Sequence, residues 1–245
     1  MTSLSREAYG SWFYDYQAGG SASSASRVLP LVFDLVQPRS IVDFGCGTGG
    51  WLAAARRLGI DDVRGIDGSW VDEDTLAIPA EMFQRCDLEQ RPRLARSFDL
   101  ALCLEVAEHL AAWRADTLVE DLCCAAEVVL FSAAVPGQTG SHHRNEQWPQ
   151  YWKAKFAQQD YEMVDCLRAR LWHDDAIEPW YIQNIYLYVA ERRLDSDPRL
   201  QAAASETGRI PLDVIHPRLF GLFSKPFAPA DPEPVGREAA PVVFE

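Results

Sequence analysis

The chain has 245 residues, of which 48% are hydrophobic and 24% are charged, as in a typical folded globular protein. This length suits one sizeable α/β domain. The formal net charge of −13 repels polyanions, which disfavours a nucleic-acid partner without excluding a local basic groove.

The other bulk features favour a cytoplasmic protein. No apolar run is long enough to span a bilayer, and the opening MTSLSREAYGSW lacks the basic start and apolar core of a secretion signal. The six cysteines occur singly in apolar runs or as one adjacent pair, which predicts buried thiols instead of a zinc or disulfide framework. We therefore expect no membrane partner, and the sequence leaves the oligomeric state open.

The chain begins with an aromatic segment, residues 1–20, that ends at a Gly19-Gly20 pair. This segment forms either a helix that packs its aromatic side chains on the core or a lid that closes over a ligand. After it, apolar residues at helical spacing predict a helix over 22–37, with serines suited to cap its start.

Short β-rich runs then alternate with helical patterns, which predicts a doubly wound, Rossmann-like α/β fold. The predicted strands are 40–44, 62–66, 82–86, 98–104, 128–134, 162–171 and 183–190. The predicted helices are 50–59, 71–76, 105–125 with a break, and 145–159. The last two strands are joined without an obvious crossover helix, so we expect the seven-stranded sheet to end in an antiparallel pair.

Beyond residue 190 the sequence is rich in proline and charge, which predicts an extended tail that docks on the domain or on a partner. The chain is therefore divided into an N-terminal lid segment (1–20), a central domain (21–190) and a C-terminal extension (191–245).

The first strand of the central domain leads into a glycine-rich loop, IVDFGCGTGGW, at 41–51. Its glycines fit a loop that approaches a ligand at a helix N-terminus, but their spacing suits both a nicotinamide dinucleotide and S-adenosylmethionine. Asp67, at the end of the second strand, can accept hydrogen bonds from a ribose diol in either cofactor. Asp43 favours S-adenosylmethionine over the nicotinamide dinucleotide. A carboxylate before the glycines repels a pyrophosphate but tolerates the cationic end of S-adenosylmethionine.

Four motifs that follow one another along the chain bear on the choice of cofactor: VDFGCGTG, GIDGS, QRCDLEQ and FDLALCLEVAEHL. Over residues 25 to 190 the chain resembles the class I S-adenosylmethionine-dependent methyltransferases, whose seventh strand is antiparallel. The resemblance implies that 21–190 is a methyltransferase domain with S-adenosylmethionine as its cofactor. It also implies a set of cofactor-binding residues: Asp43, Gly45, Gly47, Gly49, Asp67, Gly68, Asp87 facing the adenine amino group, Leu88 facing the ring, and the backbone near Cys103. Trp70 either stacks on adenine or is a partly buried surface residue.

An E-x-x-E-H pattern follows the fourth strand, and a helix there places Glu105, Glu108 and His109 on a shared face. The pattern resembles the metal site of ubiquinone-biosynthesis O-methyltransferases and small-RNA 2′-O-methyltransferases. That resemblance implies a divalent ion, Mg²⁺ or Mn²⁺. Either histidine of a later loop, His142 or His143, can complete the ligand set, and we assign this place to His142. A similar pattern also occurs in methyltransferases without a metal, where the histidine lines the pocket, and we favour this alternative.

The loop AAVPGQTGSHHRNEQWPQYW, residues 133–152, leaves the carboxyl edge of the sheet, where doubly wound folds bind ligands. His142 or His143 can act as a general base near neutral pH, as can His109 of the preceding motif. The aromatic stretch WHDDAIEPWYIQN, near the same edge, suits the wall of a small-molecule or sugar pocket.

These residues predict methyl transfer to oxygen, with nitrogen as the second choice, of a small hydroxylated acceptor such as a sugar or a natural-product intermediate. Three alternatives stay open. The first is a metal-assisted RNA 2′-O-methyltransferase, which the net charge opposes. The second is a non-catalytic cofactor-binding scaffold. The third is a nicotinamide-dependent oxidoreductase, which Asp43 opposes.

Overall fold

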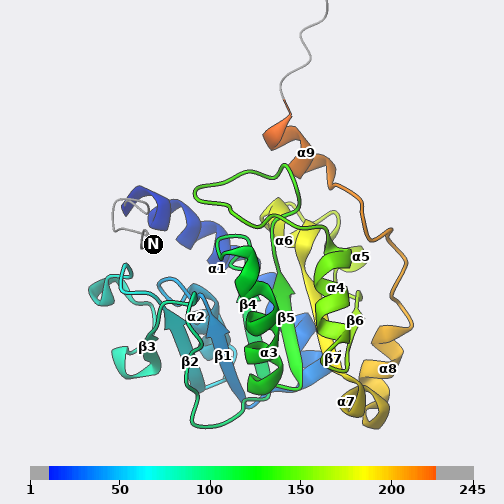
Figure 1. Ribbon diagram of the computed structural model, residues 1–245, viewed down its shortest axis with the longest axis horizontal. Helices are drawn as coiled ribbons and strands as arrows, with labels where there is room; N and C mark the ends of the chain where they lie inside the picture. Colours follow the sequence, from blue (N-terminus) through cyan, green and yellow to red (C-terminus); the bar gives the residue numbers. More distant parts are fainter. Residues whose placement is uncertain (1–10, 225–245) are drawn as a thin grey trace, which may run out of the picture.

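The computed structural model describes residues 11–224, with side chains from residue 20 onward. A seven-stranded sheet has the strand order β3-β2-β1-β4-β5-β7-β6 (Figure 1). The strands are β1 (Ser40–Phe44), β2 (Asp62–Asp67), β3 (Phe83–Arg85), β4 (Leu100–Leu104), β5 (Val128–Ser132), β6 (Tyr161–Val164) and β7 (Tyr186–Ala190).

The first five strands pair in parallel, and β7 pairs antiparallel with both β5 and β6. This arrangement confirms the predicted doubly wound sheet with an antiparallel end. The order reverses between β1 and β4, whose carboxyl ends are the expected place for a ligand in such a sheet.

Helices cover both faces of the sheet (Figure 1). The longer ones are α1 (Ser11–Val36), α2 (Gly50–Arg57), α3 (Ala115–Ala125) and α4 (Pro149–Ala157). Ile41 and Leu102 pack with residues of α1 and α2, whereas Val42 and Cys103 pack with residues of α3 and α4. Because neighbouring strand residues face opposite sides and both sides are buried, these strands are mainly apolar, with Ser40 and Asp43 of β1 as exceptions.

Helix α1 runs without interruption through the Gly19-Gly20 pair, which the sequence analysis took as the end of a separate segment. A Cβ at Gly20 would lie 2.3 Å from Glu178 Oε1, so glycine here permits close packing against the start of α6 (Pro179–Asn184). Residues 1–10 of the predicted lid, and the side chains of 11–19, lie outside the described part of the chain.

Three further predictions of secondary structure are wrong in detail. Residues 105–111 form a turn, and the helix after β4 begins only at Ala115. The predicted strand 162–171 stops at Val164, and 168–171 form the short helix α5. The predicted helix over 71–76 is a 3₁₀ turn, Glu73–Thr75.

The C-terminal extension is partly helical where it is described, with α7 (Glu191–Ser196), α8 (Pro198–Ala204) and α9 (Pro217–Phe223). It contacts the helices beside the sheet: Gln183 Nε2 of α6 donates to Val214 O at 2.5 Å, and Arg168 of the short helix at 168–171 donates to Pro211 O at 3.2 Å. None of the helices in the described part of the chain is long and apolar enough to cross a membrane.

Candidate functional site

The loop between β1 and α2 forms the floor of the candidate site. Gly45, Gly47 and Gly49 adopt left-handed backbone conformations, with φ of 82°, 53° and 85°. A Cβ at Gly45 would in addition lie 2.4 Å from Val106 Cγ2. Glycine tolerates both conditions, so the loop can bring backbone N–H groups close to a ligand at the start of α2.

Asp67, at the carboxyl end of β2, fastens this loop. Its Oδ2 accepts a hydrogen bond from Gly47 N at 2.7 Å, and its Oδ1 accepts one from Gly68 N at 2.6 Å. Burial raises the pKa of Asp67, and hydrogen bonds from Gly47, Gly68 and Trp70 oppose that rise. The predicted contact with a ribose stays a prediction that this geometry permits, since an oriented carboxylate has further lone pairs.

Asp43 lies beside the loop in β1 and is only 3% exposed. Burial, followed by the charge of Asp67, raises the pKa of Asp43 from 3.8 to about 7. No basic side chain in the described part of the chain forms an ion pair with Asp43. A cationic ligand group at this place would therefore stabilise the ionised carboxylate.

The residues expected beside the adenine follow the ends of β2 and β3, and Cys103, expected near the methionine end, lies in β4. The Trp70 ring covers Gly68, where a Cβ would lie 2.3 Å from Trp70 Cη2. Asp87 Oδ1 accepts a hydrogen bond from Glu89 N at 3.0 Å and so shapes the turn after β3. The side chains of Leu88 and Cys103 are both buried in the core.

The E-x-x-E-H residues lie in a turn instead of a helix. Glu105 has a φ of 54°, in the left-handed region. Its carboxylate accepts hydrogen bonds from Gln138 Nε2 at 2.9 Å and from Asn184 Nδ2 at 3.1 Å. Burial raises the pKa of Glu105 to about 7, and these hydrogen bonds oppose the rise.

Glu108, His109 and His143 form a compact cluster, with one potential ligand atom from each within 4.8 Å of the others. Glu108 is 1% exposed, and neither of its carboxylate oxygens has a hydrogen-bond partner. Burial, followed by the charge of Glu105, raises the pKa of Glu108 well above its usual value. Burial together with the two neighbouring histidines of the loop lowers the pKa of His109 to about 4, so this imidazole is neutral at pH 7.

This cluster differs from the predicted metal ligands at two positions. His143 takes the place expected for His142, and Glu105 is held elsewhere. His142 is exposed, with a φ of 64°, and its Nδ1 hydrogen-bonds with Ser141 Oγ at 2.8 Å. A buried acid without partners and two imidazoles form a donor set that fits a divalent cation.

The loop after β5 is fastened to the turn that carries Glu108. Arg144 N and Asn145 N both donate to Glu108 O, at 2.7 and 3.0 Å. His143 Nδ1 hydrogen-bonds with Glu146 Oε1 at 2.8 Å, which fixes the orientation of the imidazole. The loop therefore holds His143 in a defined position at the carboxyl edge of the sheet.

The decisive comparison is with protein families. The model of a methyltransferase domain matches residues 16–162, more than half of the chain. The chain belongs to this methyltransferase family. With its fold, it is a class I S-adenosylmethionine-dependent methyltransferase, and the nicotinamide-dependent alternative is wrong. No curated protein matches the chain.

Solved structures with the same fold support this assignment. S-adenosylmethionine-bound CalS10, an amino pentose methyltransferase from Micromonospora echinaspora, is 13% identical with a TM-score of 0.54, covering 78% of this chain and 99% of that one. Magnesium protoporphyrin IX methyltransferase from Synechocystis, also with bound S-adenosylmethionine, is 19% identical with a TM-score of 0.52, covering 75% and 88%. The methyltransferase domain of a bacterial Hen1 protein is 18% identical with a TM-score of 0.50, covering 68% and 98%. At these identities the likeness shows a shared fold and leaves the acceptor undetermined.

Several residues of the methyltransferase site were missed in the sequence analysis. Gln138 and Asn184 hold Glu105, and Ser21 lines a pocket with the glycine loop. Tyr181, which belongs to the predicted aromatic wall, lines the same pocket, and its hydroxyl is 3.1 Å from Ser21 Oγ. Gln138 and Asn184 lie in stretches that the sequence singles out, 133–152 and 172–184, but nothing in either stretch marks these two amides as partners of Glu105.

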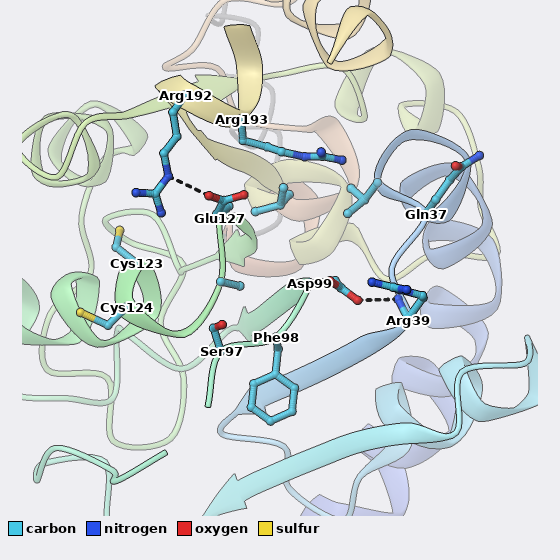
Figure 2. Close-up of a pocket in the computed structure, with 13 residues that line it drawn as sticks. Gln37, Arg39, Ser97, Phe98, Asp99, Cys123, Cys124, Glu127, Arg192 and Arg193 are labelled. Carbon is cyan, nitrogen blue, oxygen red and sulfur yellow. Dashed lines mark hydrogen bonds and ion pairs between the residues drawn. The ribbon is translucent and has the colours of Figure 1, made fainter. Parts of the chain in front are cut away.

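A second cavity of the methyltransferase, of about 420 Å³, lies at the amino edge of the sheet (Figure 2). Charged residues line it from several elements: Arg39 after α1, Asp99 before β4, Glu127 before β5, and Arg192 with Arg193 in α7. None of the predicted site residues lines this cavity, so the two edges of the sheet carry separate features.

Proposed function

We propose that this methyltransferase transfers the methyl group of S-adenosylmethionine to a hydroxyl oxygen of a small acceptor, such as a sugar or a natural-product intermediate, with nitrogen as the second choice. One observation carries the proposal. The buried Glu108 carboxylate, without a hydrogen-bond partner, lies beside His109 and His143 at the ligand-binding edge of the sheet. Polar groups of this kind, left unsatisfied inside a fold, are typical of sites that a substrate completes.

The donor would lie across the carboxyl ends of β1, β2 and β4. In this proposal Asp67 accepts hydrogen bonds from the ribose, and Asp43 faces the cationic end of the cofactor. Asp87, Leu88 and Trp70 surround the adenine. The left-handed glycine loop supports this placement, because it leaves room for a ligand above the start of α2.

The acceptor chemistry follows from the donor. The methyl group of S-adenosylmethionine is already activated, so the protein mainly aligns the acceptor oxygen with the C–S bond. A base receives the hydroxyl proton while the C–O bond forms and the C–S electron pair stays on sulfur. We assign the base to the imidazole of His143, which its hydrogen bond with Glu146 orients.

The same cluster fits a divalent ion, with Glu108, His109 and His143 as its ligands. A bound ion supplies positive charge that holds an acceptor hydroxyl and lowers its pKa. With His143 Nδ1 held by Glu146, its other ring nitrogen either coordinates an ion or accepts a proton. His143 is therefore the base only in the metal-free site, and with an ion bound the proton of the hydroxyl would pass to solvent.

A panel of hydroxylated and amino acceptors, assayed with and without a chelator, tests the proposal. We expect activity on a hydroxylated acceptor, and we expect Glu108→Gln to lower kcat/KM by about a hundredfold or more, as for loss of a well-placed catalytic group. Glu162→Gln, at an exposed acid on β6, is the matched control and keeps full activity. Methylation of amines alone, or full activity of Glu108→Gln, would refute the proposal, and chelator-resistant activity would leave His143 alone as the base.

The 3′-terminal ribose of RNA is a second candidate acceptor. The acid and imidazole cluster and the shared fold with a bacterial Hen1 methyltransferase domain favour it. The net charge of −13 opposes it, since contacts with phosphates normally dominate affinity for nucleic acids. Filter binding of a short RNA at low salt separates the two candidates, because saturable binding would contradict the argument from charge.

The N-terminal lid remains part of the proposal. Ser21 of α1 lines the pocket beside the glycine loop, so movement of this helix would change access to the cofactor. Truncation before residue 20 would then accelerate cofactor dissociation in a stopped-flow measurement, whereas an unchanged rate would contradict the lid.

A further inference from the structure

A small pocket of about 80 Å³ adjoins the glycine loop of the proposed donor site. Two acids, Asp43 and Glu105, line it, and none of its described lining residues is Lys, Arg or His. The remaining lining residues are uncharged and come from α1, the glycine loop, the start of α2, the end of β4 and α6. A pocket with this lining favours a ligand group that carries positive charge.

Glu105 is fixed within this pocket by two neutral amides. Gln138 and Asn184 are 6% and 2% exposed, and Asn184 Nδ2 also donates to Gln138 Oε1 at 2.9 Å. The three side chains therefore form a closed hydrogen-bonded triangle. Because amides carry no net charge, they orient the carboxylate without neutralising it.

The fixed position of Glu105 also separates it from the acceptor cluster. Glu108 has two carboxylate oxygens without partners and lies with two imidazoles, whereas both oxygens of Glu105 are engaged by Asn184. The two acids of the E-x-x-E-H pattern are close enough for their charges to interact, but they have different side-chain neighbours. Glu105 lines the pocket of the glycine loop, and Glu108 faces the loop after β5.

We propose that Glu105 is the carboxylate that stabilises the sulfonium of S-adenosylmethionine, and that Gln138 and Asn184 are its positioning residues. This inference rests on the proposed placement of the donor, but it does not depend on the identity of the acceptor. Methyl transfer converts the sulfonium into the neutral thioether of S-adenosylhomocysteine, because the C–S electron pair stays on sulfur. The attraction by Glu105 is lost in that step, so the site discriminates the donor from its product by charge.

Calorimetry with three ligands tests the inference, in the presence of a chelator. S-adenosylmethionine carries the sulfonium, sinefungin carries a protonated amine in its place, and S-adenosylhomocysteine carries no charge there. We expect Glu105→Gln to weaken binding of the first two by about tenfold or more, the usual scale of a charge-assisted interaction, and binding of S-adenosylhomocysteine by less than about threefold.

Two further variants separate positioning from folding. Asn184→Ala should reduce the preference for the cationic ligands in the same direction but less than Glu105→Gln, because one of the two amides remains. Glu108→Gln should leave the ratio of the affinities for S-adenosylmethionine and S-adenosylhomocysteine unchanged. A purely structural role of Glu105 would move all three affinities together, so the ratio is the informative readout.

Other outcomes overturn the inference. Equal losses of affinity for all three ligands would mean that Glu105 contacts the amino acid end of the cofactor or only supports the fold. Unchanged binding of S-adenosylmethionine together with lost Mn²⁺ binding in calorimetry would make Glu105 a metal ligand. Failure of the acceptor proposal would instead appear in the activity of Glu108→Gln, with the preference for cationic ligands intact.

Discussion

The two edges of the sheet use acidic residues in opposite ways. At the carboxyl edge, Asp43 and Glu108 are buried with a raised pKa, and neither forms an ion pair with a basic side chain in the described part of the chain. At the amino edge, Asp99 Oδ2 accepts hydrogen bonds from Arg39 N, Ser40 N and Ser40 Oγ. Glu108 at the carboxyl edge is therefore poorly satisfied and Asp99 at the amino edge is well satisfied, although Asp67 and Glu105 at the carboxyl edge also accept hydrogen bonds.

This difference indicates that the amino edge stabilises the fold and that the carboxyl edge binds a ligand. An acid that accepts backbone hydrogen bonds stabilises the ends of β1 and β4 when it is charged. A buried acid without partners destabilises the folded protein unless a cation or a hydrogen-bond donor arrives. Substitutions at the two edges should consequently have opposite effects on stability and on cofactor binding.

The largest expected effect is on cofactor binding by Asp67→Ala, at the carboxyl end of β2. The variant loses the proposed ribose contacts and the hydrogen bonds that fasten Gly47 and Gly68. Two charge-assisted hydrogen bonds are worth about 3–6 kcal/mol, so affinity for S-adenosylhomocysteine should fall by at least about a hundredfold in calorimetry. Asp62→Ala, at the amino end of the same strand, is the matched control, and equal losses in both variants would contradict the contrast between the edges.

The next effect concerns Asp43→Asn and the pH dependence of stability. The pKa of Asp43 is about 7 in the folded protein, against its ordinary value of 3.8, so the folded state binds more protons between these two pH values. Ionisation of Asp43 therefore destabilises the wild type progressively as pH rises from 4 to 7, by up to about 4 kcal/mol above pH 7. Asparagine does not titrate and should remove this loss.

Urea unfolding of the cofactor-free protein at pH 5 and pH 8 measures the effect. Asp43→Asn should be more stable than the wild type at pH 8, and the difference should shrink at pH 5. It should also bind S-adenosylmethionine more weakly, because the cation loses a facing charge. A gain of stability that is the same at both pH values would show that packing, and not ionisation, is responsible.

Much of this carboxyl edge was predictable from local sequence. The runs that form β1, β4 and β5 are mainly apolar because both sheet faces are buried. Short apolar runs that alternate with helical patterns indicate a parallel sheet. The glycine-rich loop before α2 was also recognisable in the sequence. The left-handed φ values of its glycines explain why glycine occurs at these positions. The strands, their parallel order and the family resemblance followed from these signals, and the structure and the family match confirm them.

The arrangement of the polar side chains was less predictable. EVAEHL has a pattern that suits a helix, yet the left-handed φ of Glu105 starts a turn, so the expected shared face does not exist. Its partners Gln138 and Asn184 lie 33 and 79 residues away in the chain, and only the folded sheet brings them together. His142 and His143 are adjacent on an irregular loop, where no periodicity tells which imidazole faces Glu108.

A smaller effect is expected at the amino edge, for Asp99→Ala. The variant removes the acceptor of the hydrogen bonds from Arg39 N and Ser40, and the loss of such bonds costs about 1–3 kcal/mol of unfolding free energy. Urea unfolding should show this loss, and calorimetry should show unchanged affinity for S-adenosylmethionine. A change of that affinity by more than about threefold, or about 0.7 kcal/mol, would mean that the two edges are coupled.

The smallest effect is expected for Arg192→Gln, which removes the ion pair with Glu127 at the rim of the amino-edge cavity (Figure 2). The side chains of Arg192 and Glu127 are 77% and 46% exposed, so water and salt screen the pair. Such pairs contribute less than about 1 kcal/mol, and the loss should disappear at about 0.5 M salt, where the screening length is a few ångströms. A larger loss, or one that persists in high salt, would show that this ion pair is part of a buried network, and the amino edge would then resemble the carboxyl edge in its dependence on individual charges.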